Sequence, residues 1–246
     1  MDFLGINNEK ISEGIQKKIL VFGAGAAGAT ITYLLAQYGY QHIYLIDDDC
    51  VEISDIEKTL IYKKGDIGRL KIDVLSMYLL ENFGLNIVTK CCSPISKDEL
   101  LRLINSIQPD LIIKACDPDL SFRYYLNEIC FLKSIPFVYM SYSYERINIG
   151  PFFVPGLTGS DIDLEKNFTQ ICGPQYNYLN HKKIYPNLLI HPSTSFNINI
   201  LGGIILKEII FFHLNHYEYV FSLNREVFFF PLSMRILYRS IIQQKL

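Results

Sequence analysis

Residues 17–39 read KKILVFGAGAAGATITYLLAQYG, and this stretch decides the fold. An apolar run comes first, glycines interrupt it, and apolar residues then recur at helical spacing as far as Gly39. A strand, a tight turn and a helix follow one another in this way in the unit that builds parallel sheets. The stretch therefore predicts the opening strand and helix of an α/β domain.

The turn within this stretch reads G-A-G-A-A-G, from Gly23 through Gly25, Ala26 and Ala27 to Gly28. In such a turn the first glycine makes the bend, the second lets a phosphate approach the backbone, and the third allows the helix to pack closely on the strand. The N-terminus of the following helix favours negative charge. We expect a nucleotide phosphate to lie against these residues; a glycine turn without a ligand is the alternative.

Apolar runs and helical patterns continue to alternate beyond this turn. The expected strands occupy 42–49, 86–92, 110–117 and 136–143, and the expected helices occupy 68–84, 96–107 and 120–134. Alternation of this kind predicts a doubly wound, mostly parallel, Rossmann-like α/β sheet. Ser96 followed by Glu99 is typical of a capping box at the start of the second of these helices.

The pattern changes after residue 144. Residues 144–156 alternate and contain proline, which predicts an antiparallel C-terminal extension of the sheet. We divide the single domain into a nucleotide-binding core at 1–154, a polar crossover loop at 155–192, and a C-terminal helix and hairpin at 193–246. The hairpin is expected to turn at Leu223 and Asn224.

Composition narrows the class of protein. The 246 residues are 50% hydrophobic with a formal net charge of −2, which favours one well-packed domain and gives no support to nucleic-acid binding. Six cysteines without a CxxC pair indicate reduced thiols, and the polar start MDFLGINNEK lacks the features of a signal peptide, so we expect a cytoplasmic protein. The apolar stretch 196–212 carries Asn, Lys and Glu, so we interpret it as a buried helix and expect no membrane span.

Unlike charges gather after the second expected strand. Asp47, at the end of that strand, lies 19 residues beyond Gly28 and suits a ribose hydroxyl. An NAD-linked enzyme would share both features. The basic segment GDIGRLK at 65–71 separates the two possibilities, because an ATP-cleaving site must neutralise phosphate charge and a dehydrogenase has no such need.

These motifs, taken in order, resemble one family. GxGxxG and an acidic strand end are followed by V-E-x-S at 51–54, D-I-G-R-x-K at 66–71 and a further aspartate, Asp117. This order is similar to that of the ThiF/MoeB/HesA adenylating superfamily, which has the fold of ubiquitin-activating enzymes, over residues 18–155 and in the helix at 193–214. Within the superfamily the chain looks most similar to the microcin-type enzymes that activate a peptide carboxyl end.

The resemblance implies a reaction and a set of roles. A carboxylate attacks the α-phosphate of ATP and gives an acyl-adenylate and pyrophosphate. By position, Lys71 would contact the phosphates and stabilise the transition state, and Asp117 would hold magnesium. Asp47 would bind the ribose, and Asp49 would lie near the phosphates or the metal. Lys58 would take the place of an arginine, with loss of its bidentate fork.

Some of these residues have simpler interpretations. Lys71 is alternatively a solvent-exposed helix lysine. Asp117 is alternatively, or also, a helix N-cap. Arg69 has at most a supporting role, and we interpret Arg123 as a paired or exposed residue of an amphipathic helix.

The chain departs from the family pattern in several places. The usual N-L-x-R-Q is D-I-E-K-T here, so Asp55 adds negative charge near a triphosphate and Thr59 replaces a glutamine. No pair of CxxC motifs is present, and His181 and His191 stand alone, so we expect no zinc. Cys172 has no adjacent base or cation, so a thioester-forming role for it is disfavoured. Because few residues precede the first strand, we expect no folded peptide clamp of the kind that the microcin-type enzymes carry.

The leading hypothesis is ATP-dependent adenylation of a carboxyl or amide group of a peptide or small protein, in the modification of ribosomal peptide natural products. A degenerate nucleotide-binding partner subunit without turnover is the main alternative, and an NAD-linked oxidoreductase is a weaker one. The resemblance also implies a homodimer.

Overall fold

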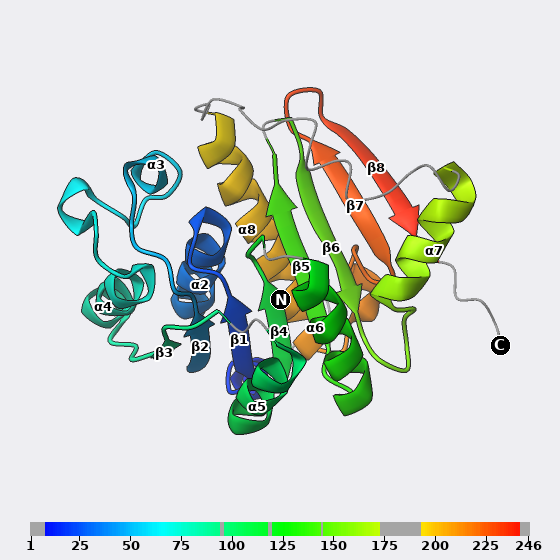
Figure 1. Cartoon of the computed structure of the whole chain (residues 1–246), viewed down its shortest axis with the longest axis horizontal. Helices are drawn as coiled ribbons and strands as arrows, with labels where there is room; N and C mark the ends of the chain where they lie inside the picture. The colour runs from blue at the N-terminus through cyan, green and yellow to red at the C-terminus, as the bar shows by residue number, and fades with distance from the viewer. Residues whose placement is uncertain (1–7, 94–95, 118–119, 144, 173–192, 242–246) are drawn as a thin grey trace.

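A single mixed sheet forms the centre of the computed structural model, which describes residues 8–93, 96–117, 120–143, 145–172 and 193–241. The strand order is β3-β2-β1-β4-β5-β6-β7-β8 (Figure 1). The strands are β1 (Lys18–Phe22), β2 (His42–Ile46), β3 (Val88–Lys90), β4 (Leu111–Lys114), β5 (Phe137–Tyr142), β6 (Ile147–Phe153), β7 (Arg225–Phe230) and β8 (Arg235–Ser240). The first five pair in parallel, and β6, β7 and β8 extend the sheet antiparallel. The predicted fold class is confirmed.

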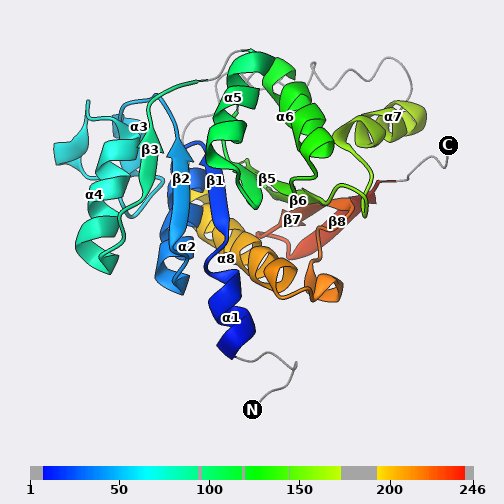
Figure 2. The ribbon, with the colours of Figure 1, turned by 90° about the horizontal axis from the view of Figure 1, so that it is seen from below.

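Helices cover both faces of the sheet. Figure 2 shows α5 and α6 on one face and α2 and α8 on the other. The helices are α1 (Asn8–Gly14), α2 (Ala26–Tyr38), α3 (Ile53–Ile56), α4 (Lys71–Phe83), α5 (Lys97–Ile107), α6 (Leu120–Lys133), α7 (Asp161–Cys172) and α8 (Ser193–His213), with short 3-10 turns η1 (Lys64–Asp66) and η3 (Tyr217–Tyr219). Successive residues of a strand point to opposite faces, so Ile19 and Val21 pack under α2 and α8 while Leu20 and Phe22 pack under α5 and α6.

The boundaries of the helices follow from local sequence. Gly39 and Gly84 adopt the left-handed conformation that ends α2 and α4. The predicted capping box begins α5: the Ser96 hydroxyl accepts from Glu99 N at 3.3 Å, and the Glu99 carboxylate accepts from Ser96 N at 3.2 Å. These features set the ends of three helices, α2, α4 and α5.

Helix α8 has the composition of a membrane span but lies against the sheet. Over Ser195–His213 it is long and apolar enough to cross a membrane, and 44% of that stretch is buried inside the protein. It packs against α2, β5 and β6, with Ile198, Leu201 and Ile205 fully buried. This packing accounts for its apolar character.

Two expectations about the C-terminal third need correction. The region expected to be a loop, 155–192, contains α7, whose first turn is closed by Ser160 and Asp163: Asp163 accepts from Ser160 N at 2.8 Å. The hairpin does not turn at Leu223 and Asn224, because those residues lead into β7 and the reversal comes at 231–234, before β8. His181, His191 and the side chain of Cys172 lie outside the described residues.

Candidate active site

The glycine-rich turn joins β1 to α2 at the carboxyl edge of the parallel strands. Gly23 has φ of +103°, and a Cβ there would lie 2.8 Å from the Ala115 carbonyl oxygen. A Cβ on Gly28 would lie only 1.8 Å from the Gly23 carbonyl oxygen, so Gly28 is required by packing within the turn. No heavy atom of the described residues lies within 4 Å of a Cβ built on Gly25. That position opens outward, as the approach of a phosphate requires.

Asp47 ties the end of β2 to this turn. Its Oδ2 accepts from Ala24 N at 2.6 Å and its Oδ1 from Asp49 N at 2.8 Å. Burial raises the pKa of Asp47, and the two backbone N–H bonds offset only part of that rise. Each carboxylate oxygen keeps a second lone pair, so the predicted ribose contact is compatible with these bonds and stays a prediction.

Tyr62 was not identified from the sequence, although it contacts the same turn. Its hydroxyl donates to the Ala24 carbonyl oxygen at 2.5 Å, and the side chain is only 2% exposed. Thr59 positions it, because the Thr59 hydroxyl accepts from Tyr62 N at 3.2 Å. The apolar pair Ile61–Tyr62 inside a charged segment was the one sequence signal that these residues turn inward.

The charged segment after β2 folds back on itself and brings Lys71 to Asp49, just beyond the end of β2. Cys50 and Leu70 form an antiparallel bridge, and Lys71 N donates to the Asp49 carbonyl oxygen at 3.0 Å. Lys71 is the first residue of α4, and only 7% of it is exposed. The alternative of a solvent-exposed helix lysine is therefore wrong. Arg69 lies on the outer side of the bridge, where it is exposed and pairs with Asp66 at 3.0 Å.

Two carboxylates hold the Lys71 ammonium. Its Nζ lies 3.3 Å from Asp49 Oδ2 and 3.5 Å from Asp55 Oδ2. Burial alone would lower the pKa of Lys71, but Asp55 and then Asp49 outweigh it, so the pKa is raised and the amine stays charged at neutral pH. Asp55 is itself only 6% exposed and accepts from Glu52 N at 2.9 Å at the start of α3. The aspartate that appeared electrostatically unfavourable in the sequence is thus the partner of the lysine.

Asp117 and Lys58 are less constrained. Asp117 is exposed three residues beyond β4, in the segment that the glycine turn touches through Ala115 and Cys116. Neighbouring Lys114 donates from Nζ to the Cys116 carbonyl oxygen at 2.9 Å. Within the described part of the chain, neither Asp117 nor Lys58 makes a side-chain hydrogen bond or ion pair. Their predicted roles with metal and phosphate stay predictions.

The donor atoms at this edge suit magnesium. The carboxylate oxygens of Asp47, Asp48 and Asp49, which follow β2, lie within 4.8 Å of one another, and Asp117 follows β4, two strands along the sheet. Magnesium prefers carboxylate oxygen and phosphate. Both oxygens of Asp47 accept backbone bonds, whereas Asp49 pairs with Lys71 through Oδ2 alone and Asp117 is exposed, so Asp49 and Asp117 are the better candidates.

Arg123 is paired, as expected, and lies with Lys114 over the ring of Tyr139. It forms a bidentate ion pair with Asp161, which is 3% exposed. Asp161 also accepts from the Tyr139 hydroxyl at 3.3 Å, and its backbone N–H donates to the Asn127 side chain at 3.0 Å. This cluster anchors the start of α7 to α6.

The fold and this edge define a nucleotide-binding Rossmann-like domain in which a buried lysine joins the glycine-rich turn. Residues 6–225 match the ThiF family, and the chain belongs to that family.

Individual relatives agree with this family. The chain is 31% identical over 120 residues to an adenylyltransferase and sulfurtransferase MOCS3 of Culex quinquefasciatus. The aligned stretch covers 49% of this chain and 27% of the relative. It is 33% identical over 92 residues to a NEDD8-activating enzyme E1 catalytic subunit of Dictyostelium discoideum, covering 36% of this chain and 21% of the relative. The chain thus spans about a quarter of the length of these relatives.

The fold is shared with E. coli MccB. The structure of MccB with AMPCPP and MccA gives a TM-score of 0.81 at 18% identity, covering 98% of this chain and 68% of MccB. The structure of MccB with ATP gives 0.78 at 19% identity, covering 96% and 68%. At this identity the likeness establishes the fold.

Proposed function

We propose that the chain is an ATP-dependent adenylyltransferase that activates a carboxyl or amide group of a peptide or small protein. The observation that carries the proposal is the Lys71 ammonium, buried and 3.3 Å from Asp49, beside a glycine turn whose Gly25 faces open space. A dinucleotide site needs the turn but not the lysine. Membership of the ThiF family and the adenylyltransferases among its relatives support the same reaction.

The reaction is a displacement at phosphorus. A substrate carboxylate oxygen attacks the α-phosphorus of ATP, the bond from that phosphorus to its bridging oxygen breaks, and pyrophosphate leaves. Lys71 opposes the negative charge that develops on the phosphates, in a setting from which water is largely excluded. The turn and Asp47 hold the nucleotide, and Lys58 adds charge from the neighbouring loop. Asp49 and Asp117 would hold magnesium, which supplies further neutralisation of phosphate charge.

A peptide is the favoured substrate class. The solved proteins that share the fold include a microcin C7 biosynthetic enzyme, MccB, in complex with N-formylated MccA. We extend the proposal to the modification of ribosomal peptide natural products on this ground.

Pyrophosphate exchange tests the proposal. The chain is incubated with ATP, magnesium, labelled pyrophosphate and candidate peptides, and label entering ATP is measured. We expect Lys71→Met to reduce exchange by about 10²- to 10³-fold, the usual effect of losing one charge-stabilising group. Lys64→Met is the matched control, because Lys64 is an exposed lysine of the same segment. Equal exchange in the two variants would exclude Lys71 from the reaction.

A nucleotide-binding partner without turnover is the second candidate. The two ion pairs that Lys71 makes with Asp49 and Asp55 favour the partner subunit, because a triphosphate must displace these carboxylates to reach the amine. Calorimetry with ATP separates the two: tight binding without exchange for any peptide tested supports the partner subunit. Family membership disfavours the NAD-linked oxidoreductase.

The proposal includes a homodimer. Strand β8 ends the sheet and carries exposed apolar side chains on both faces, with Leu237 58% and Tyr238 62% exposed. Such an edge invites pairing with a second copy. Leu237→Lys should shift the chain toward monomer in light scattering, whereas Leu132→Lys, at a more exposed site on α6, should not.

A further inference from the structure

Tyr62 connects the charged segment after β2 to the glycine-rich turn, and its hydrogen bond fixes one peptide group of that turn. The Tyr62 hydroxyl donates to the Ala24 carbonyl oxygen at 2.5 Å. The Ala24 N–H is held as well, because it donates to Asp47 Oδ2 at 2.6 Å. Side chains from two segments therefore hold both backbone polar groups of Ala24, a fully buried residue. The peptide that joins Ala24 to Gly25 cannot rotate without breaking the bond to Tyr62.

The orientation of this peptide decides where the Gly25 N–H points. The carbonyl and the N–H of a trans peptide point in opposite directions. Because the Ala24 carbonyl points at Tyr62, the Gly25 N–H points away from it. Gly25 is the one residue of 23–28 that is not buried, and its N–H has no acceptor in the described part of the chain. It is thus a backbone donor at the start of α2 that a ligand can use.

A glycine in this position needs a hydrogen bond from elsewhere to keep the peptide in place. With no Cβ, and with no described atom within 4 Å of one built there, Gly25 lets the peptide rotate at little steric cost. Thr59 places Tyr62, because the Thr59 hydroxyl accepts from Tyr62 N at 3.2 Å. Burial and then the nearby Asp47 raise the pKa of Tyr62, so its hydroxyl keeps its proton and remains a donor.

We propose that Tyr62 is a positioning residue for adenylation, because it directs the Gly25 N–H onto the α-phosphate of ATP. The α-phosphate is the one bonded to the ribose, and the predicted ribose partner Asp47 contacts Ala24, the neighbour of Gly25. The bond strengthens as negative charge grows on the oxygens of the α-phosphorus during attack. Tyr62 is only 2% exposed, so it acts through the backbone and not by touching the nucleotide. The inference deepens the proposed function and rests on it.

Tyr62→Phe removes the hydroxyl and keeps the ring. The affinities for ATP, AMP and adenosine are measured by calorimetry, with adenosine also measured by competition against ATP. We expect ATP and AMP to bind about tenfold more weakly, the loss expected for one charge-assisted hydrogen bond. Adenosine binding should stay unchanged, because adenosine has no phosphate. An effect of the variant on the fold alone would weaken all three ligands.

Tyr40→Phe is the matched control. Tyr40 is 1% exposed, and its hydroxyl bonds His213 Nδ1 at 2.8 Å at the amino edge of the sheet, opposite the glycine turn. This variant also loses a buried tyrosine hydroxyl, and thermal unfolding compares the two losses of stability. All three affinities should stay unchanged in Tyr40→Phe.

Three results in Tyr62→Phe would overturn the role of Tyr62. Adenosine weakened as much as AMP would mean that Tyr62 supports the whole turn. Weakening of ATP alone would assign the effect to the outer phosphates, and unchanged affinities would remove any effect. If the parent chain exchanges pyrophosphate, these results leave the proposed function intact. A parent chain that binds no ATP would refute both.

A measurement on the parent chain covers the case in which Tyr62→Phe does not fold. In a nitrogen-15 spectrum of the glycine-labelled chain, the Gly25 amide is the signal that is missing from Gly25→Ala. We expect AMP to move this amide proton downfield and adenosine to leave it in place, because only AMP offers a phosphate acceptor. An amide proton that does not move with AMP would overturn the proposal.

Discussion

The two edges of the sheet differ in how their charges are satisfied. At the carboxyl edge the Lys71 ammonium has two carboxylate partners at 3.3 and 3.5 Å. At the amino edge His213 has a buried ring nitrogen without a partner in the described part of the chain, and Lys17 has only a contact at 3.9 Å. A ligand at the carboxyl edge must therefore compete with existing ion pairs, whereas the unpaired nitrogen at the amino edge is covered by the protein itself and costs stability when the ring is protonated.

The largest expected effect concerns the steric part of the carboxyl edge. Gly28→Val places a Cβ 1.8 Å from the Gly23 carbonyl oxygen, so the turn and α2 must move apart. We expect a loss of about 3 kcal/mol or more in the free energy of unfolding, together with loss of ATP binding. Urea unfolding and calorimetry measure the two. Gly65→Ala is the control, because no described heavy atom lies within 4 Å of its added Cβ; equal stability of both variants would show that the turn is not sterically fixed.

At the amino edge, the burial of His213 should make the stability of the chain depend on pH. The unfolded pKa of His213 is 6.5 and the folded pKa is about 4, so between these values the unfolded chain binds more protons. The stability that neutral His213 contributes is present above pH 6.5 and is lost as the pH falls toward 4. The full difference corresponds to about 3 kcal/mol.

His213→Gln tests this dependence while keeping an acceptor for Tyr40. The groups that face the ring are Tyr40, Lys17, Asp110 and Glu13. Urea unfolding at intervals between pH 4 and 7 should give a flatter curve for the variant than for the parent chain. Parallel curves would mean that the histidine is not held neutral by burial.

The charged part of the carboxyl edge should respond to Asp55→Asn. The amide oxygen can still accept from Glu52 N, but the charge 3.5 Å from Lys71 is gone. We expect a loss of about 1 kcal/mol in stability at pH 7 and about tenfold tighter ATP binding, because the triphosphate no longer competes with a buried carboxylate. Calorimetry with ATP measures this gain, and Asp73→Asn, on an exposed face of α4, is the control. Unchanged or weaker ATP binding would remove the idea of competition.

Sequence patterns predicted what local chemistry decides. The glycine turn follows from sterics among neighbours in the chain, and the capping box at Ser96 and Glu99 follows from three residues of helix. Lys71 was identified because it stands at fixed spacing in a motif.

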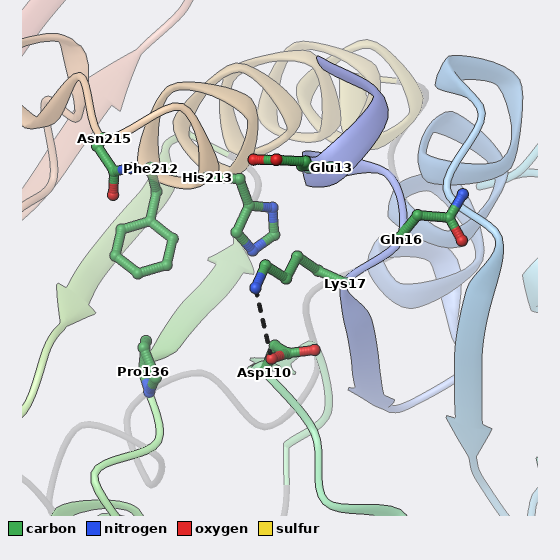
Figure 3. Close-up of a pocket in the computed structure, with 9 residues that line it drawn as sticks. Glu13, Gln16, Lys17, Asp110, Pro136, Phe212, His213 and Asn215 are labelled. Carbon is green, nitrogen blue, oxygen red and sulfur yellow. Dashed lines mark ion pairs between the residues drawn. The ribbon is translucent and has the colours of Figure 1, made fainter. Parts of the chain in front are cut away.

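Partners distant in the chain were missed. Asp55 contacts Lys71 only because Cys50 and Leu70 form a β-bridge. Helix α7 begins where Asp161 pairs with Arg123, which lies 38 residues earlier in the chain. Helix α1 and the end of α8 line one pocket, at Glu13 and His213 (Figure 3), and no sequence motif marks either segment. Such contacts depend on tertiary packing that periodicity does not encode.

Gly25→Ala should give the smallest change in stability, and it tests nucleotide binding separately from folding. Its φ of −65° is open to alanine, and an added Cβ meets no described atom within 4 Å. Gly25→Ala should therefore change the free energy of unfolding by less than about 0.5 kcal/mol. ATP affinity should nevertheless fall about fivefold, because the methyl group occupies space that the phosphates need. An unchanged affinity would mean that the nucleotide does not approach the turn at this residue. The nucleotide would then be bound at the carboxyl edge through charged side chains alone.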